Sequence, residues 1–266
     1  MVDISHSVKL AQDYMTFLVS AKSSAGHGIH SPMVYDFVRK VVQPTPSCPH
    51  LEEIEWYRDW QENSPMSIRK STFGAGSRLA QKSIPISKLI KSTSVSSKTG
   101  SFLFRLAQWL DAKNILELGT SIGISTMYLA SACPKATILT LEGDAKRAAY
   151  ARDSFEFMGW DNIKLIEGEF DLTLDKVIDG YTKFDLIFFD GNHSAEPTLR
   201  YFKQCLNSRH ENSVFVFDDI RWSNEMFRAW EVISQHNSVT VSIDLFNIGV
   251  AFFRNGIPKQ HFMINF

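Results

Sequence analysis

Hydrophobic and polar residues follow two different patterns along this chain. In the N-terminal part, residues 7–22 and 33–42 have apolar side chains at helical spacing. From residue 114 onward, short continuous apolar runs alternate with stretches of helical spacing. Continuous apolar runs are typical of parallel strands with helices on both faces of the sheet. We therefore predict a helical N-terminal extension or cap over residues 1–110 and a domain of alternating strands and helices over residues 111–266.

Seven apolar runs in the second part have the composition of strands, and their order predicts the fold. The last two runs are joined only by Asn247, Ile248 and Gly249, which is too short for the crossover that parallel strands need. They should therefore form an antiparallel hairpin at the C-terminus. We predict an α/β, Rossmann-like, doubly wound fold with a mostly parallel seven-stranded sheet. The runs are 114–119, 136–143, 162–168, 184–191, 213–219, 238–246 and 250–254.

Composition and charge exclude several classes of protein. Hydrophobic residues make up 44% of the 266 residues and charged residues 21%, which is ordinary globular usage. The net charge of -1 lacks the excess expected of a dedicated nucleic-acid or anionic-membrane binder. Three cysteines are too few for a disulfide framework. The N-terminus lacks the pattern of a secretory signal, and no stretch has the roughly 20 apolar residues that span a bilayer. We predict a cytoplasmic protein.

A glycine-containing turn follows the first predicted strand. Glu117, Gly119 and Gly123 have the spacing Glu-x-Gly-x-x-x-Gly, and glycine permits a tight turn and a close approach of the backbone to a ligand. Ser121 replaces the middle glycine of a dinucleotide fingerprint, which disfavours pyrophosphate binding. Glu142 ends the second strand 25 positions after Glu117, where a carboxylate can accept both ribose hydroxyls. A purely structural turn and a solvated strand-end carboxylate are the alternative interpretations.

This segment resembles the first motif of small-molecule O-methyltransferases, which belong to the class I S-adenosylmethionine-dependent methyltransferases. The resemblance implies S-adenosylmethionine as the cofactor, with its ribose on Glu142 and its adenine near the segment 168–170. It also implies a cofactor contact from the acid that ends the fourth strand. The cofactor-binding residues predicted in this way are Glu117, Gly119, Thr120, Ser121, Gly123, Glu142, Gly168, Glu169, Phe170 and Asp190.

Acidic residues end the fourth and fifth predicted strands. Asp190 ends the fourth, and Asp218 and Asp219 end the fifth. Because ligands of an open parallel sheet bind beyond the carboxyl ends of its strands, we expect these side chains to converge. Converging carboxylates repel each other, and a hard divalent cation such as Mg²⁺ neutralises them with oxygen ligands. His193, three positions after Asp190, can titrate near neutral pH and serve as a general base.

The arrangement resembles metal-dependent O-methyltransferases of the catechol, caffeoyl-coenzyme A and macrolide-sugar types. The resemblance implies Asp190, Asp218 and Asp219 as metal ligands, and His193 with Asp190 as catalytic residues. The Asp-Asp pair is closer to the macrolide-sugar type than to the Asp-Asn of the catechol type. In the alternative interpretation Asp190 only positions the cofactor, the paired acids cap the helix around Ser223, and His193 caps or packs locally.

The flanking segments leave two interpretations open. Segments 26–37 and 72–78 combine glycines with histidine, arginine and aromatic residues, and are either lids over the site or parts of a structural cap. Arg221 and Trp222 follow the paired acids and are either a pocket wall or packing residues. Five segments also resemble uncharacterised methyltransferases of Bacteroidetes-type bacteria, a resemblance that names no substrate. They are HGIHSPMVYDFVRKV, FGAGSR, FFDGNHSAEPTLRYF, FDDIRWSNEMFRAW and IDLFNIGVAFFR.

We predict metal-assisted O-methylation of a small hydroxylated substrate, with no membrane partner and a homodimer compatible with the aromatic C-terminal edge. Methylation of RNA is a second hypothesis, which rests only on Lys82, Lys88, Lys91 and Lys98, and the near-neutral charge argues against it. A third hypothesis is a cofactor-binding protein without turnover, which the acids and His193 disfavour.

Overall fold

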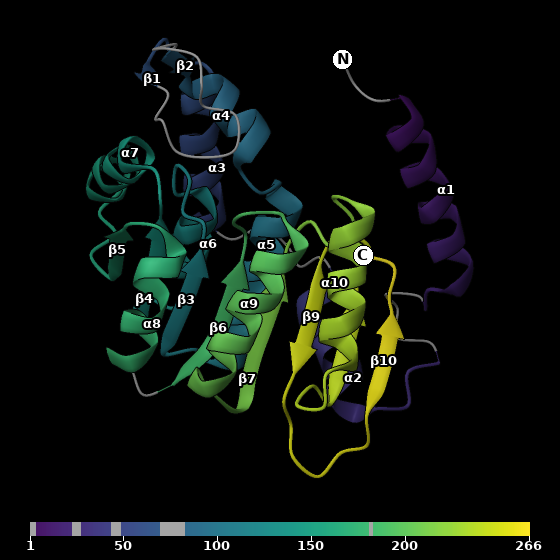
Figure 1. Ribbon diagram of the computed structural model, residues 1–266. Helices are drawn as coiled ribbons and strands as arrows, with labels where there is room; N and C mark the ends of the chain where they lie inside the picture. The colour runs from purple at the N-terminus through teal and green to yellow at the C-terminus, as the bar shows by residue number, and fades with distance from the viewer. Residues whose placement is uncertain (1–3, 23–27, 44–48, 70–82, 181–182) are drawn as a thin grey trace. The chain divides into compact units, whose positions relative to one another are not determined.

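The computed structural model describes residues 4–22, 28–43, 49–69, 83–180 and 183–266 (Figure 1). Contacts divide the chain into two compact units. The central unit comprises residues 46–187, and the terminal unit comprises residues 1–45 and 188–266. The domain boundary predicted after residue 110 stays a prediction. Within the described ranges, no helix is both long and apolar enough to cross a membrane.

Three parallel strands form the sheet of the central unit. Strand β3 (Asn114–Leu118) pairs with β4 (Thr137–Glu142), which pairs with β5 (Ile163–Glu167). Most side chains of β3 and β4 are buried, which explains their continuous apolar sequence. The register places Glu117 opposite Thr140. The helices that follow these strands are α6 (Ile124–Ala132), α7 (Ala145–Phe157) and α8 (Phe170–Gly180).

Helices that precede β3 pack against the helices that follow the strands of this unit. The Tyr57 hydroxyl donates to Ser154 Oγ at 2.6 Å and so joins α3 to α7. Helix α5 begins where Ser96 Oγ accepts the Thr99 N–H and ends at Asp111, which has a left-handed φ of 47°. These elements are α3 (Pro49–Glu62), β1 (Ser67–Arg69), β2 (Ser83–Pro85), α4 (Ile86–Thr93) and α5 (Ser97–Leu110).

The terminal unit contains the predicted antiparallel hairpin. Strand β8 (Val241–Asp244) pairs antiparallel with β9 (Gly249–Phe252), and β9 pairs antiparallel with β7 (Arg209–Phe217). A short strand that the sequence analysis did not anticipate, β10 (Gln260–Met263), pairs in parallel with β8. The helical segments are α1 (Ile4–Ser20), α2 (Pro32–Phe37), η1 (Val38–Val42), α9 (Ala195–Cys205), η2 (Leu206–Ser208) and α10 (Asn224–Gln235).

Strand order confirms the predicted fold class. Together with β6 (Phe184–Phe189), the strands have the order β10-β8-β9-β7-β6-β3-β4-β5 in an eight-stranded sheet. The sheet is mixed, with its antiparallel pairs near the C-terminus, as the short link through Asn247 required. Strand β10 was not predicted because only Phe262 of its four residues is buried and the strand has no continuous apolar run.

Candidate functional site

The turn after β3 needs glycine for both backbone and packing reasons. Gly119 and Gly123 have φ values of 110° and 92°, which residues with a side chain rarely adopt. A Cβ atom on Gly123 would lie 2.5 Å from the ring of Phe155. Gly123 therefore has a structural role, whatever binds above the turn.

Backbone hydrogen bonds hold the same turn against β4. The N–H groups of Gly119 and Thr120 both donate to the Leu141 carbonyl oxygen, at 3.0 and 3.1 Å. Ser121 has a φ of 49°, a strained value for a residue with a side chain, and its hydroxyl contacts the Thr93 hydroxyl at 2.8 Å. The end of α4 thus helps to hold the turn in its shape, a role for Thr93 that the sequence did not suggest.

Glu117 is buried beneath this turn. Its Oε2 accepts hydrogen bonds from Thr126 Oγ1 at 2.5 Å and Thr140 Oγ1 at 2.6 Å, and its exposed fraction is 0%. Its Oε1 is buried and has no hydrogen-bond partner among the described residues. Burial raises the pKa of this carboxyl, although the hydroxyl contacts act in the other direction. The alternative of a solvated carboxylate is therefore wrong.

Sequence reasoning missed the two threonines that support Glu117. Thr140 is a polar residue in the middle of the apolar run ILTLE, and its hydroxyl also contacts that of Thr120 at 2.6 Å. A buried hydroxyl in an otherwise apolar strand needs a partner, so Thr140 carried a signal that a neighbouring strand would supply one.

Glu142 links two loops at the end of β4. Its Oε2 accepts the Ser121 N–H at 2.7 Å, and its Oε1 accepts the Asp144 N–H at 2.8 Å. Burial raises the pKa of Glu142 as well, while these backbone hydrogen bonds oppose the rise. Each carboxylate oxygen has two lone pairs, so each can accept a further hydrogen bond from a ligand.

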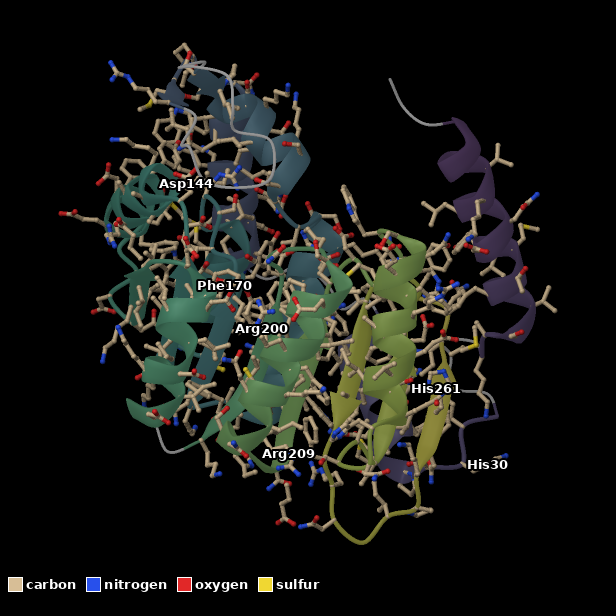
Figure 2. The ribbon with its side chains drawn as sticks, viewed as in Figure 1. His30, Asp144, Phe170, Arg200, Arg209 and His261 are labelled. Carbon is tan, nitrogen blue, oxygen red and sulfur yellow. The ribbon has the colours of Figure 1, made fainter. Side chains whose placement is uncertain are left out.

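The third predicted cofactor segment is attached to the strand that carries Glu142. The Gly168 N–H donates to the Glu142 carbonyl oxygen at 2.9 Å, and Gly168 has a φ of 142°. Phe170, half-buried, begins α8, and Asp144 caps α7 (Figure 2). Glu169 is exposed. The contact of this segment with adenine stays a prediction.

In the terminal unit, the imidazole of His193 stands between two of the predicted acids. His193 Nε2 lies 3.9 Å from Asp190 Oδ1, and His193 Nδ1 lies 3.8 Å from Asp219 Oδ2. These distances suit an ion pair with a protonated imidazole but exceed those of a hydrogen bond. Asn192 and Asp219 both have a φ of 53°, a left-handed conformation that Asn and Asp tolerate better than most residues.

Asp218 and Asp219 are adjacent carboxylates with little positive charge to balance them. Asp218 Oδ1 accepts the Asp219 N–H at 2.9 Å. Burial, together with the charge of Asp219, raises the pKa of Asp218 to about 7. Burial also raises the pKa of Asp219, and His193 lowers it. The capping alternative is wrong for these acids, because Ser223 Oγ caps α10 by accepting a hydrogen bond from its first turn.

Asp190, Asp218 and Asp219 are not gathered around a common point. Across the part of the chain that the structure describes, no three His, Cys, Asp or Glu side chains form a group that could hold a metal ion. The metal-binding role of these residues stays a prediction.

The two residues after the paired acids have different environments. The ring centroid of Trp222 lies 5.7 Å from that of His193, and Trp222 is 59% exposed, so it can form a pocket wall. The Arg221 guanidinium is paired with both oxygens of Asp244 at 2.8 Å. The charge of Arg221 is thus already paired within the protein, and its role as an anion contact stays a prediction.

Several residues named from the sequence lie outside the described ranges. These are the first two residues of segment 26–37, the whole of segment 72–78, and Lys82. Of the other lysines considered for RNA binding, Lys91 lies 3.7 Å from Glu62 in an ion pair.

Comparison with known proteins defines the family. The model of a family described as O-methyltransferase matches residues 79–248, which is more than half of the chain. This chain belongs to that O-methyltransferase family.

Two curated relatives are named catechol O-methyltransferase. The protein from Niastella koreensis is 38% identical over 130 residues, which cover 48% of this chain and 58% of the relative. The protein from Mycobacterium tuberculosis is 33% identical over 128 residues, or 47% of this chain and 56% of the relative. The matched region thus spans little more than half the length of these relatives.

Solved structures confirm the fold. A methyltransferase from Podospora anserina, solved with SAH bound, has a TM-score of 0.59 and 20% identity, covering 85% of this chain and 97% of that chain. An O-methyltransferase from Bacillus cereus in complex with SAH has a TM-score of 0.54 and 23% identity, covering 83% and 97%. At these identities the likeness concerns the fold alone.

Proposed function

We propose that this protein is an S-adenosylmethionine-dependent O-methyltransferase that acts on a small hydroxylated molecule. The observation that carries the proposal is the central-unit cluster around Glu117: a buried carboxylate oxygen that has no hydrogen-bond partner among the described residues, next to a turn whose glycines have left-handed φ values. Family membership and the catechol O-methyltransferase names of the relatives support the same reaction class.

The residues of the central unit fit this cofactor. Glu117 Oε1, which no other described residue hydrogen-bonds, is an acceptor suited to the ammonium group of the methionine end. Glu142, fixed by two backbone N–H groups, has free lone pairs for the ribose hydroxyls. We propose that the turn from Gly119 to Gly123 lies under the methionine portion and that residues 168–170 contact the adenine.

The terminal unit supplies the proton chemistry. The cofactor supplies an electrophilic methyl group to the acceptor oxygen. We propose that His193 takes the hydroxyl proton of the acceptor onto a ring nitrogen, and that Asp190 and Asp219 on either side stabilise the resulting imidazolium. Trp222 offers a flat apolar face to the acceptor beside the imidazole. We assign both groups of residues to one reaction because the family model matches residues 79–248, a stretch that contains them all.

We further propose that Asp190, Asp218 and Asp219 would hold a divalent cation such as Mg²⁺. Carboxylate oxygens are the ligands that Mg²⁺ prefers. Burial raises the pKa of both Asp218 and Asp219, and the charge of Asp219 adds to the rise at Asp218; a bound cation would offset both costs of ionising these acids. Such a cation would make a bound hydroxyl more acidic. The imidazole between Asp190 and Asp219 means that these side chains must move to share one ion.

The surroundings of the protein also belong to the proposal. Cys133 and Cys205 are free thiols, which fits a reducing compartment, and we propose a cytoplasmic location. We expect a small molecule as the substrate and no membrane partner, and we retain a homodimer as a hypothesis.

Titration calorimetry with S-adenosylmethionine and SAH tests the core of the proposal. Saturable binding of both is expected. Glu142→Ala should weaken it by at least about tenfold, because loss of the carboxylate removes the ribose acceptor and leaves two backbone N–H groups without their partner. The exposed Glu211→Ala serves as a charge control. Absence of binding to the well-folded protein would overturn the proposal.

Methyl transfer to catechol, measured after chelation with EDTA and again after addition of Mg²⁺, tests the metal separately. Loss and recovery of the rate would support the ion. A rate that is indifferent to EDTA would remove the metal from the proposal and leave the cofactor assignment intact.

A further inference from the structure

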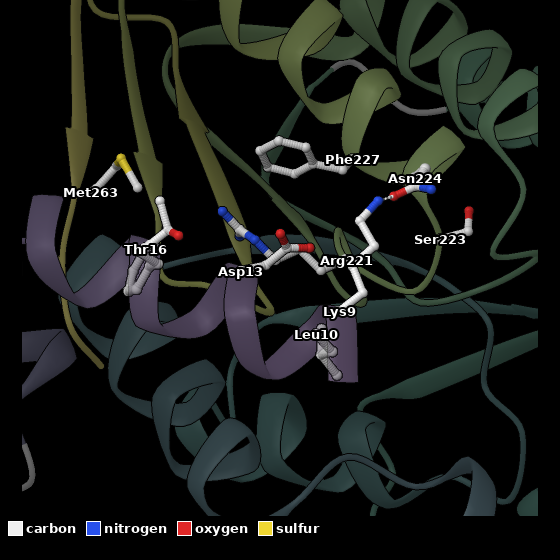
Figure 3. A pocket seen from close by; sticks show the side chains of 10 residues that line it. Lys9, Leu10, Asp13, Thr16, Arg221, Ser223, Asn224, Phe227 and Met263 are labelled. Carbon is white, nitrogen blue, oxygen red and sulfur yellow. Dashed lines mark hydrogen bonds between the residues drawn. The ribbon is translucent and has the colours of Figure 1, made fainter. Parts of the chain in front are cut away.

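A cavity of about 270 Å³ lies within the terminal unit, between α1 and the segment that leads into α10 (Figure 3). Lys9 and Asp13 line it from α1, and Ser223 and Asn224 line it from the start of α10. Apolar side chains complete the lining: Leu10, Phe17, Phe227 and Met263. The proposed methyl transfer does not use this cavity.

One wall of the cavity is fixed by Arg221. Its guanidinium is paired with both Asp244 oxygens, and it lies 4.5 Å from the ring centroid of Phe227 and 5.4 Å from that of Phe17. The side chains of Arg221 and Asp244 are 8% and 3% exposed. Arg221 therefore closes this side of the cavity, and its charge is already balanced.

Two opposite charges on α1 face the cavity. Lys9 and Asp13 are four residues apart, a spacing at which such side chains often pair on a helix surface. Here the Lys9 ammonium instead reaches across to the Asn224 side-chain oxygen, as Figure 3 shows. The Asp13 carboxylate has no hydrogen-bond or ion-pair partner among the described residues. The cavity thus has a basic end at Lys9 and an acidic end at Asp13, and its apolar surface lies between α1 and α10.

We propose that this cavity binds a small zwitterion with the chemistry of an apolar amino acid. The ligand ammonium pairs with Asp13, its carboxylate with Lys9 and the Asn224 amide, and its side chain packs on Leu10, Phe17, Phe227 and Met263. The volume suits a ligand smaller than a drug-sized molecule, because pockets for drug-sized ligands usually measure about 300–1,000 Å³ and this one, at about 270 Å³, lies just below that range. A zwitterion satisfies both charges at once, which a simple amine or a simple acid does not.

This site is distinct from the proposed methyl-transfer site. Trp222 lies beside His193, whereas its neighbours Arg221 and Ser223 line the cavity. The inference does not depend on the methyltransferase assignment, so its test uses binding alone.

Calorimetry with L-leucine, isopentylamine and 4-methylpentanoate tests the inference. The three probes share an apolar group and carry both charges, only the ammonium, or only the carboxylate. We expect saturable binding of L-leucine with a dissociation constant of about 1 mM or lower, and binding of each single-charge probe at least about tenfold weaker. No saturable signal with L-leucine, or equal binding of all three probes, would overturn the proposal.

Variants assign the two ends of the ligand. Asp13→Asn should weaken L-leucine at least about tenfold and leave 4-methylpentanoate unchanged, and Lys9→Met should weaken L-leucine and leave isopentylamine unchanged. Both positions are exposed on α1, so the fold should survive. The controls Asp59→Asn and Lys164→Met make the same changes at exposed positions of the central unit. Unchanged affinity for L-leucine in Asp13→Asn would contradict the assignment.

Discussion

The candidate cofactor residues of the central unit and the candidate chemical residues of the terminal unit are held very differently. Both carboxylates in the central unit are fixed by short hydrogen bonds, Glu117 by two threonine hydroxyls and Glu142 by two backbone N–H groups. In the terminal unit, His193 lies 3.8–3.9 Å from its two acids, beyond hydrogen-bond distance.

The difference matches two separate requirements of a transferase, cofactor binding and proton transfer. A cofactor site gains affinity when its groups are already in place, since little entropy is then lost on binding. A base such as His193 must instead accept a proton and release it, and contacts that tighten only with the substrate allow both. We therefore expect substitutions in the two regions to have separable effects.

His193→Ala should have the largest effect, and it should lower turnover without changing the affinity for the cofactor. Loss of a general base typically lowers turnover about 10²–10⁴-fold, whereas no bond from His193 supports the cofactor cluster. Methyl-transfer rates and SAH calorimetry on the same preparation measure both quantities. His50→Ala, at an exposed position of α3, is the control. Equal losses of turnover and SAH affinity would reject the separation.

Gly123→Ala should destabilise the central unit, because the added methyl group disturbs the packing of the turn. The added Cβ would meet the Phe155 ring at 2.5 Å in a left-handed backbone, so we expect a loss of about 2–4 kcal/mol in the free energy of unfolding. Gly159→Ala is a matched control, because its φ is 74° and no atom lies within 4 Å of the added Cβ. That variant should lose only about 1–2 kcal/mol, from backbone strain. Urea unfolding of both measures the difference, and equal losses would show that the Phe155 contact is unimportant.

Glu117→Gln should have the smallest effect, and it tests whether the pKa of the buried carboxyl is raised in the folded protein. Because burial raises its folded pKa above the ordinary 4.5, the stability linked to its protonated form is present below that value. This stability is lost as the pH rises through the folded pKa. The wild type should therefore lose stability relative to Glu117→Gln, by up to about 1.4 kcal/mol per pH unit in this window.

Unfolding free energies across the acid-to-neutral range measure this loss. Glu169→Gln, at an exposed position, should follow the wild type. Parallel curves for wild type and Glu117→Gln would contradict the raised pKa.

Much of the fold could be predicted because its signals are local. The run ILTLE of β4 is buried along its length, and the short link through Asn247, Ile248 and Gly249 allows only an antiparallel return. Strand β10 could not be predicted in the same way. Its residues owe their pairing to β8, and an edge strand of four residues has too little apolar surface to leave a pattern.

The sequence by itself determined which residues stand at strand ends and which turns need glycine, since these depend on neighbours in the chain. Only the tertiary structure decided what those residues contact. It buried Glu117 against Thr126 and Thr140, turned Arg221 to Asp244, and placed Lys9 and Asp13 of α1 opposite Asn224. The physical reason is that hydrogen bonds and desolvation depend on distances between segments far apart in the chain, which no local pattern of apolar and polar residues encodes.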